Sequence, residues 1–348
     1  GEIVLAGADR ALLGSTLQVL EEAGVVFEDS GAGLKVSRLA LGLGLRGQAD
    51  ANAAQRMIEH AIDQGINLID CANVYAPLDN HRNNGQSELI LGRAIAGKRD
   101  QVVITSKVAS RVGPGPNDAG LSRGHILREI DRSLQRLGTD YLDVYLVHVF
   151  DPSTPLEETM RALDDVVRAG KVRYLGCCNF AAWQVCQAQW TAERIHGTPF
   201  TAVQNQYSLL ERGPERELFG VVRALGLGMM AYSPLAIGLL SGLYTPGQPA
   251  PEGTFWHQRG AERYERLMGG QVGRVVTTVV EIARELGKTP AQVALAWVLS
   301  HPEVTCAITG GDTIAHLDDN LGAVGWSLDP ELRARLDEVS KTRSLLDV

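Results

Sequence analysis

Short apolar runs that alternate with longer stretches of helical period constrain the fold of this 348-residue chain more than any other feature. The stretch from Ala54 to Ile62, for example, places apolar residues at the spacing of one helix face. It lies between two runs, RLALG and INLID, that have the length of strands. The eight expected strands cover residues 38–42, 66–70, 101–106, 142–147, 172–176, 202–204, 227–231 and 304–308.

The strand candidates are continuously apolar rather than alternating, which is typical of a parallel sheet covered on both faces. Eight such strands with intervening helices can close into a barrel or remain an open, doubly wound sheet. The open dinucleotide-binding sheet carries a glycine-rich phosphate loop after an early strand, and no such loop occurs here. The pattern therefore predicts an α/β protein with a (β/α)8 barrel.

Three segments do not follow the alternation. Residues 1–24 are expected to be an N-terminal extension of unknown role, preceding a barrel domain over 25–348. Val25–Phe27 and Leu34–Val36, joined through a glycine-containing turn, predict a hairpin across the barrel floor. The stretch from Ser241 to Gly270 is too long for an ordinary connection and is interpreted as a functional loop.

Composition excludes several classes of protein. The net charge of −8 argues against a nucleic-acid partner or an anionic membrane surface, and no apolar run reaches the length of a membrane span. The five cysteines are odd in number and none has the CxxC spacing of a zinc site. We therefore expect reduced thiols, no metal, and a cytoplasmic protein.

Polar residues stand where the strands end. Asp70, Lys107 and His148 each follow an apolar run directly, and Cys178, Asn179, Gln204 and Ser233 end or follow three later ones. Because the carboxyl ends of barrel strands form one face, these side chains are expected to meet there, where barrel active sites are built.

Together with Tyr75, three of these residues have the chemistry of carbonyl reduction. Tyr75 can donate a proton to the carbonyl oxygen, and the ammonium of Lys107 is expected to lower the pKa of the phenol. Asp70 can keep Lys107 charged and oriented, while a neutral His148 can polarise the carbonyl through a hydrogen bond.

These motifs resemble the aldo-keto reductases, in particular the branch of bacterial reductases and potassium-channel β subunits. The resemblance covers most of the chain, from about Gly33 to Ser340. It rests on GLKVSRLALG, DCANVY, GQSELILG, ITSK, LVHVFDP, GKVRYLGCCNF, VQNQYSLL, SPLAIGLLSG and GDTIAHLDDNLGA. It implies a barrel with an extended nicotinamide cofactor across its top and the four catalytic residues named above.

The resemblance also implies a cofactor site. Asn179 and Gln204, beside Cys178, would hold the carboxamide, and Tyr207 would stack on the nicotinamide ring. The remaining implied contacts, to the pyrophosphate and then the adenosine, are Ser233, Leu235, Gly238, Gly242, Gly310, Asp312, His316, Asp319 and Asn320.

The family default is NADP(H), but two positions depart from it. Leu243 replaces a basic residue, and Asp312 stands near the expected 2′-phosphate, where a carboxylate suits the ribose hydroxyl of NAD(H). Three arginines of the long loop, Arg259, Arg263 and Arg266, would have to restore phosphate binding. The cofactor choice is left open between NADP(H) and NAD(H).

The substrate is expected to be a small carbonyl compound: an aldehyde, a ketone or a sugar. The polar segment Asp79–Asn83 would suit a hydroxylated or anionic substrate, whereas Phe150 and Trp256 would supply an apolar wall. Two alternatives stay open: a cofactor-binding regulatory subunit with little turnover, and a nucleotide-sugar lyase or epimerase. A homo-oligomer is also compatible with the sequence.

Overall fold

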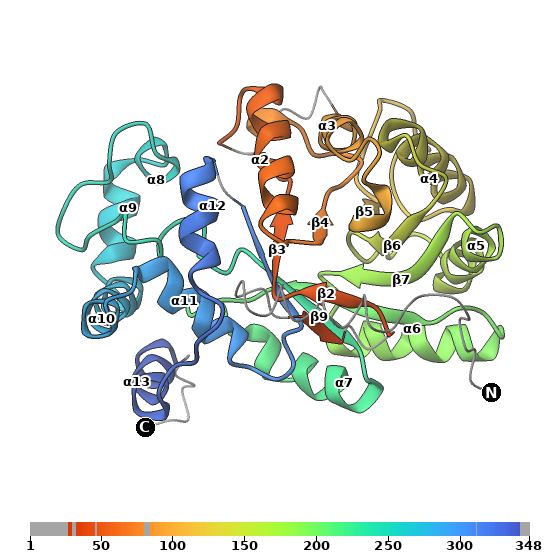
Figure 1. Cartoon of the computed structure of the whole chain (residues 1–348). Helices are drawn as coiled ribbons and strands as arrows, with labels where there is room; N and C mark the ends of the chain where they lie inside the picture. Colours follow the sequence, from red (N-terminus) through yellow and green to blue (C-terminus); the bar gives the residue numbers. More distant parts are fainter. Residues whose placement is uncertain (1–26, 30–32, 46, 80–83, 311, 342–348) are drawn as a thin grey trace, which may run out of the picture.

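The computed structural model describes residues 27–29, 33–45, 47–79, 84–310 and 312–341. Eight parallel strands form a closed barrel in the order β10-β3-β4-β5-β6-β7-β8-β9, which confirms the predicted (β/α)8 fold (Figure 1). The barrel strands are β3 (Leu39–Gly42), β4 (Leu68–Asp70), β5 (Val103–Val108), β6 (Leu142–Val147), β7 (Val172–Cys178), β8 (Phe200–Gln206), β9 (Gly228–Tyr232) and β10 (Cys306–Thr309).

All eight predicted strands are present, with ends that differ from the prediction by a few residues. The largest differences are in β5, which extends through Lys107 to Val108, and in β8, which is longer at both ends. β10 pairs with both β3 and β9, so the first and last strands close the barrel. The polar residues at the strand ends therefore share one face.

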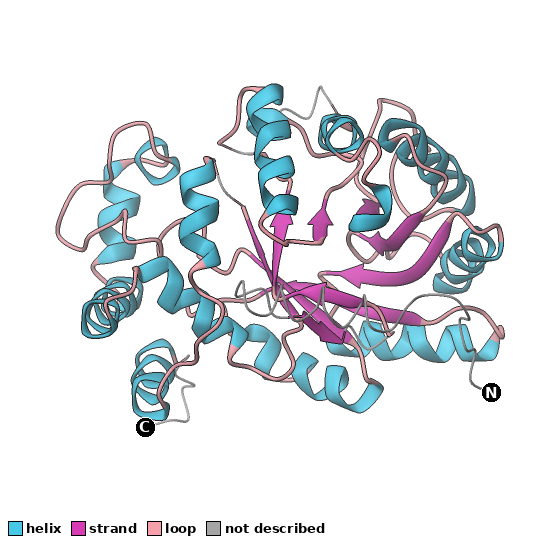
Figure 2. Ribbon diagram, viewed as in Figure 1, coloured by secondary structure: helices cyan, strands magenta, loops and turns pink. Residues whose placement is uncertain are grey.

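Helices form the outer layer around the barrel (Figure 2). Most of them bury an apolar stripe, as α2 does with Met57 and Ile58. Their bounds are α2 (Ala51–Asp63), α3 (Gln86–Ala94), α4 (Arg123–Leu137), α5 (Leu156–Arg168), α6 (Ala182–Arg194), α7 (Leu218–Leu225), α8 (Phe255–Gln258), α9 (Ala261–Met268), α10 (Gln271–Leu286), α11 (Pro290–Leu299), α12 (Ile314–Leu321) and α13 (Pro330–Ser340).

Helix ends follow local chemistry in most cases. α11 begins with a capping box, in which the Thr289 hydroxyl accepts from the Gln292 amide and the Gln292 side chain accepts from Thr289. Ser122 occupies the expected N-cap position of α4, but its side chain makes no capping hydrogen bond. The Glu158 carboxylate accepts from the Arg123 amide instead, because the neighbouring helix α5 supplies a charged acceptor.

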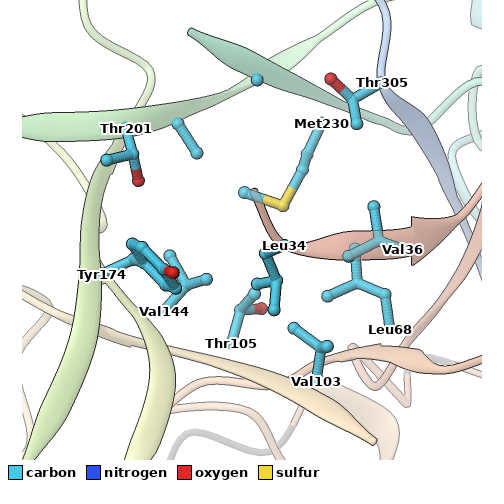
Figure 3. A pocket seen from close by; sticks show the side chains of 12 residues that line it. Leu34, Val36, Leu68, Val103, Thr105, Val144, Tyr174, Thr201, Met230 and Thr305 are labelled. Carbon is cyan, nitrogen blue, oxygen red and sulfur yellow. The ribbon is translucent and has the colours of Figure 1, made fainter. Parts of the chain in front are cut away.

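A hairpin lies at the amino-terminal end of the barrel strands. β1 (Phe27–Asp29) pairs antiparallel with β2 (Lys35–Ser37), one to two residues later along the chain than predicted; Val25, Val26 and residues 1–24 lie outside the described residues. Figure 3 shows Leu34 and Val36 at an apolar cavity of about 30 Å³ lined also by Leu68 and Val103. The hairpin strand β2 therefore closes the barrel floor, leaving the opposite end for the site.

The stretch 241–270 is not a structureless loop, because it contains the short helices α8 and α9. Tyr264 and Met268 of α9 are buried, and Tyr244 packs against Tyr264 with ring centroids 5.9 Å apart. Within this segment, α9 packs against α10 of the helix layer. Its functional role stays a prediction.

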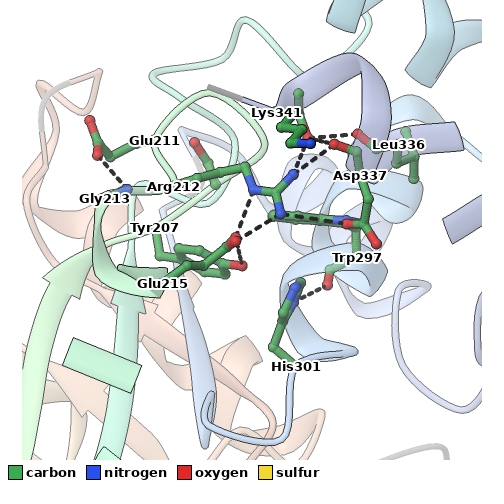
Figure 4. Close-up of polar contacts among 12 residues, drawn as sticks. Tyr207, Glu211, Arg212, Gly213, Glu215, Trp297, His301, Leu336, Asp337 and Lys341 are labelled. Atoms are coloured by element: carbon green, nitrogen blue, oxygen red, sulfur yellow. Dashed lines mark hydrogen bonds and ion pairs between the residues drawn. The ribbon is translucent and has the colours of Figure 1, made fainter. Parts of the chain in front are cut away.

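Arg212, in the loop after β8, attaches the C-terminal helix α13 to the barrel (Figure 4). Its guanidinium pairs with Glu215 at 2.7 Å and donates to the Asp337 carbonyl and the Ser340 hydroxyl. The Trp297 indole donates to the Asp337 carboxylate at 2.8 Å. α13 is therefore held by partly buried polar contacts as well as by apolar packing.

Within the described ranges, no helix is long and apolar enough to cross a membrane. Over the same residues, no group of three or more His, Cys, Asp or Glu side chains is placed to hold a metal ion. All five cysteines are free thiols.

Candidate active site

Lys107 and Asp70 form a completely buried ion pair inside the barrel. Lys107 points inward from the carboxyl end of β5, and its ammonium lies 2.7 Å from both carboxylate oxygens of Asp70 at the end of β4. It also donates to the Cys71 carbonyl at 2.9 Å. Thr105 and Gln204 donate to the same carboxylate, at 2.5 and 2.8 Å. The carboxylate is thus fully used within the protein.

Burial acts to lower the pKa of Lys107, but the charge of Asp70 and its hydrogen bonds outweigh this effect and hold that pKa well above its usual range. Lys107 is therefore an ammonium at any physiological pH. A fixed positive charge stands at the centre of the barrel mouth, with no exposure to water.

Tyr75 lies against this charge. The Lys107 ammonium is 4.8 Å from the centroid of the Tyr75 ring, and the Tyr75 hydroxyl is 3.4 Å from Nε2 of His148. Burial raises the pKa of Tyr75 to about 12, and Lys107 offsets only part of this rise. The predicted net lowering of this pKa is therefore wrong, because desolvation of the phenolate exceeds the stabilisation by Lys107.

His148 follows β6 and completes the group. Burial, with a smaller contribution from the charge of Lys107, lowers its pKa to about 4. The imidazole is therefore neutral near pH 7, as predicted. Its ring meets the Tyr75 ring edge-on, with centroids 5.7 Å apart. A neutral imidazole and a phenol thus lie side by side above a buried ammonium.

The loop that carries Tyr75 is held from outside the barrel. The Ser87 hydroxyl donates to the Ala72 carbonyl, and the Ser87 amide donates to the Tyr75 carbonyl. Asn73 donates to Glu129, a carboxylate of α4 that is 0% exposed. Sequence reasoning missed this contact, because a buried glutamate on a helix face has the same spacing as a solvent-facing one.

The side chains predicted to hold a carboxamide are close together but already hydrogen-bonded to protein. Gln204 donates to Asp70 and accepts weakly from the Cys178 thiol at 3.7 Å. Asn179 is exposed and has a left-handed backbone with φ of 59°, and its amide donates to the His148 carbonyl at 3.1 Å. Asn179 is therefore the more accessible of the two amides.

The prediction that Tyr207 stacks on a cofactor ring is wrong. Its side chain is 0% exposed, its ring stacks on Trp297 at 5.4 Å, and its hydroxyl donates to Glu215 (Figure 4). Tyr232, at the end of β9, was missed. Its hydroxyl donates to Asn179 at 2.8 Å, so it lies at the mouth beside an exposed amide. Its place directly before Ser233 is the signal that could have found it.

The loop after β9 bends through left-handed backbone. Ser233, Ala236 and Ile237 have φ near 50°, and Gly238 follows at 82°. Such conformations are strained for residues other than glycine and concentrate at functional sites. Of the other residues predicted here, Leu235 is half-buried, whereas Gly242 is exposed and has φ of 89°.

The residues predicted around an adenosine lie in the loop after β10 and on α12. Gly310, Asp312 and His316 are exposed. Asp319 accepts from Thr289 and Gln292 of α11, so its carboxylate already stabilises helix packing, and Asn320 is buried. Only the first three are therefore freely accessible on this side of the barrel.

The structure describes only some of the residues considered for the substrate pocket. Asp79 is described, but Asn80, His81, Arg82 and Asn83 lie outside the described residues. Phe150 packs edge-on against Phe180 and Trp183, and the Trp256 indole donates to the Ile237 carbonyl. Both aromatics are therefore engaged in local packing.

Comparison with known proteins assigns the family. Residues 38–341 match the model of the "Aldo/keto reductase family". The chain is 38% identical over 315 residues to the "Uncharacterized oxidoreductase YrpG" of Bacillus subtilis, covering 88% of this chain and 93% of that protein. It is 36% identical to a "Probable voltage-gated potassium channel subunit beta" of Arabidopsis thaliana, covering 84% and 89%. It is 34% identical to the "Versiconal hemiacetal acetate reductase" of Aspergillus parasiticus, covering 88% and 94%. The chain therefore belongs to the aldo/keto reductase family.

Proposed function

We propose that this protein is an oxidoreductase that reduces an aldehyde, ketone or sugar carbonyl, or oxidises the corresponding alcohol, using NAD(P)(H). One observation carries the proposal: Tyr75 is held between the buried ammonium of Lys107 and the neutral imidazole of His148. The names of the relatives, an oxidoreductase and a hemiacetal acetate reductase among them, agree with this chemistry.

The residues at the barrel mouth suit a nicotinamide dinucleotide. Consecutive left-handed residues after β9, from Ala236 to Gly238, curve the backbone in the manner of anion-binding loops. Asn179 offers an exposed amide beside Tyr232, within the same mouth. When bound, the nicotinamide ring would supply hydride to the carbonyl carbon or accept it from the alcohol carbon.

The chain's own residues manage the proton. As the carbonyl carbon gains hydride, electron density moves to its oxygen, and that oxygen takes the proton of the Tyr75 hydroxyl. The Lys107 ammonium stabilises the phenolate that remains, which favours transfer from a phenol with a high resting pKa. Asp70 fixes Lys107, and the neutral His148 donates an N–H to the substrate oxygen.

The surroundings of Asp312 favour NAD(H) over the family default. Asp312 is exposed, its carboxylate lies against Gly47, and its carbonyl accepts from Gln48. Two of the loop arginines have local partners, since Arg266 pairs with Glu262 and Arg259 lies over Phe255. We expect NADH to bind at least as tightly as NADPH in a fluorescence titration. Tenfold tighter binding of NADPH would overturn this assignment.

A carbonyl panel tests the proposed function. The purified protein is mixed with NADH or NADPH and with 4-nitrobenzaldehyde, methylglyoxal, an alkyl ketone and an aldose, and cofactor absorbance is followed. Oxidation that depends on the carbonyl is the expected result. Tight cofactor binding with no oxidation across the whole panel would contradict the proposed function.

A second candidate is a cofactor-binding regulatory subunit, and the relatives named as potassium channel β subunits favour it. An enzyme with turnover remains the first candidate function, because Asp70, Tyr75, Lys107 and His148 are all present and in contact. The two differ in the panel: the subunit would retain nucleotide through purification and show negligible turnover. A stable complex with another protein would support it further.

A further inference from the structure

Both ring nitrogens of His148 face a hydroxyl group. Nε2 lies 3.4 Å from the Tyr75 hydroxyl, and Nδ1 lies 3.4 Å from the hydroxyl of Ser110. The first contact belongs to the proposed catalytic group. The second has no part in the chemistry described above, and Ser110 belongs to none of the motifs that carry the family resemblance.

The protonation of His148 makes the second contact important. Because its pKa is lowered to about 4, the imidazole is neutral at pH 7 and carries one N–H. That hydrogen lies either on Nε2, toward Tyr75, or on Nδ1, toward Ser110. Only the Nε2–H form can donate toward a substrate oxygen held beside Tyr75.

The hydrogen-bond directions around Tyr75 favour one of the two tautomers of His148. If the Tyr75 proton is to reach the substrate oxygen, the Tyr75 hydroxyl cannot donate it to Nε2 of His148. Nε2 then carries the hydrogen, and Nδ1 is left as an acceptor. The Ser110 hydroxyl is the group placed to donate to it.

We propose that Ser110 is a positioning residue, which donates its hydroxyl hydrogen to Nδ1 of His148 and thereby keeps the imidazole hydrogen on Nε2, facing Tyr75. This inference rests on the proposed function for its effect on catalysis. The tautomer itself is a property of the protein and can be measured without substrate.

The backbone holds Ser110 in place for this role. Ala109, directly after β5, has φ of 140°, a conformation that residues other than glycine rarely adopt. Gly120 donates to the Ala109 carbonyl at 2.7 Å. The His148 amide donates to the Val108 carbonyl at 2.8 Å, so both residues are fixed to the same strand end.

A second connection ties the two loops together. Leu121, at the end of the Ser110 loop, donates its amide to Asp151 at 2.8 Å. Asp151 belongs to the loop that follows His148 and accepts also from Ser153 and Thr154. The strained backbone at Ala109 is therefore supported by hydrogen bonds within its own loop and to the loop after His148. Such support favours a fixed orientation for the Ser110 side chain.

Nitrogen NMR tests the inference directly. In ¹⁵N-histidine-labelled protein at pH 7, the His148 signals are assigned with His148→Gln among the eight histidines. We expect Nε2 to be protonated and Nδ1 unprotonated. Ser110→Ala and Ser110→Val should shift signal toward the Nδ1–H form, and Ser110→Thr should retain the original pattern. Ser122→Ala serves as the matched control, because it removes the serine hydroxyl at the start of α4, which makes no capping hydrogen bond.

Turnover gives the second readout. Ser110→Val should lower kcat roughly tenfold, the low end for loss of a partner that orients a functional imidazole, with KM within twofold. Ser110→Thr, of the same shape as valine, should restore kcat. A wild-type Nδ1–H form, a spectrum unchanged in Ser110→Val, or a shifted spectrum without loss of kcat would overturn the inference. Failure of the proposed function would appear differently, as a wild-type protein without turnover.

Discussion

Asp70→Asn should strongly destabilise the fold, because it leaves the Lys107 ammonium buried without a counter-charge. Lys107 has 0% side-chain exposure and the Asp70 carboxylate 5%, so water cannot replace the lost partner. Asp70 accepts two hydrogen bonds from Lys107 and one each from Thr105 and Gln204, and asparagine offers a single acceptor oxygen. Removing one member of such a pair costs about 3–5 kcal/mol, against a total stability of about 5–15 kcal/mol.

The pH dependence gives the prediction a sign. In the wild type the pKa of Lys107 is raised above its ordinary 10.5, so the pair's contribution is complete below about pH 10 and is lost only as pH rises through the folded-state value. In Asp70→Asn, burial would depress the pKa of Lys107 instead. The unfolded state then binds more protons than the folded state, and the stability of the variant should rise with pH toward about 10.

Urea unfolding followed by circular dichroism at pH 6, 7.5 and 9 measures both effects. The double variant Asp70→Asn/Lys107→Met is the control, since it removes both charges and should recover most of the loss. A single variant that loses less than about 1 kcal/mol, with no slope in pH, would refute the description of a dry, mutually dependent pair.

Three further predictions concern the mouth, the helix layer and the C-terminal helix. Burial lowers the pKa of His148 from 6.5 to about 4, so the free energy of unfolding should fall by up to about 3 kcal/mol as the pH drops between these values. His148→Gln should flatten this part of the stability curve. An unchanged curve would contradict the assigned pKa. Gly92→Ala would place a methyl group 2.7 Å from the Leu137 carbonyl oxygen and should lower the free energy of unfolding by about 1–3 kcal/mol. Gly124→Ala, in open space on α4, should raise it by up to about 1 kcal/mol. Equal melting temperatures for the two variants would be inconsistent with this packing. Arg212→Met removes the partner of Glu215 and the links to α13, and should speed amide exchange in α13 and cost about 2 kcal/mol; undiminished protection of that helix would show that apolar packing alone holds it.

The positions of Asp70, Lys107 and His148 could be predicted because a parallel barrel brings the carboxyl ends of its strands to one face. The pKa values of the site residues could not be predicted in the same way. The effect of Lys107 on Tyr75 is opposed by desolvation, and the extent of burial depends on side chains from several strands. A sequence shows which charges are near one another in the chain, but not how much water the fold excludes.

Tyr207 and Tyr232 illustrate a second limit. Tyr207 follows β8 and Tyr232 ends β9, and each stands next to polar residues. The sequence pattern alone therefore cannot decide which of the two rings points into the barrel mouth. Tyr207 is taken out of the site by Trp297, which lies 90 positions later in the chain and stacks on it. The Glu129–Asn73 contact likewise depends on how α4 packs over the Tyr75 loop. Long-range packing decided each case.

The central claim is that Tyr75 donates the proton to the carbonyl oxygen, and single-turnover kinetics of Tyr75→Phe test it most directly. The variant keeps the ring that Lys107 faces and removes only the hydroxyl that lies 3.4 Å from His148. With enzyme and NAD(P)H in excess over the best carbonyl of the panel, we expect cofactor affinity within twofold of wild type and a rate of cofactor oxidation lower by about 10²–10⁴. A rate within threefold of wild type would show that the proton comes from elsewhere.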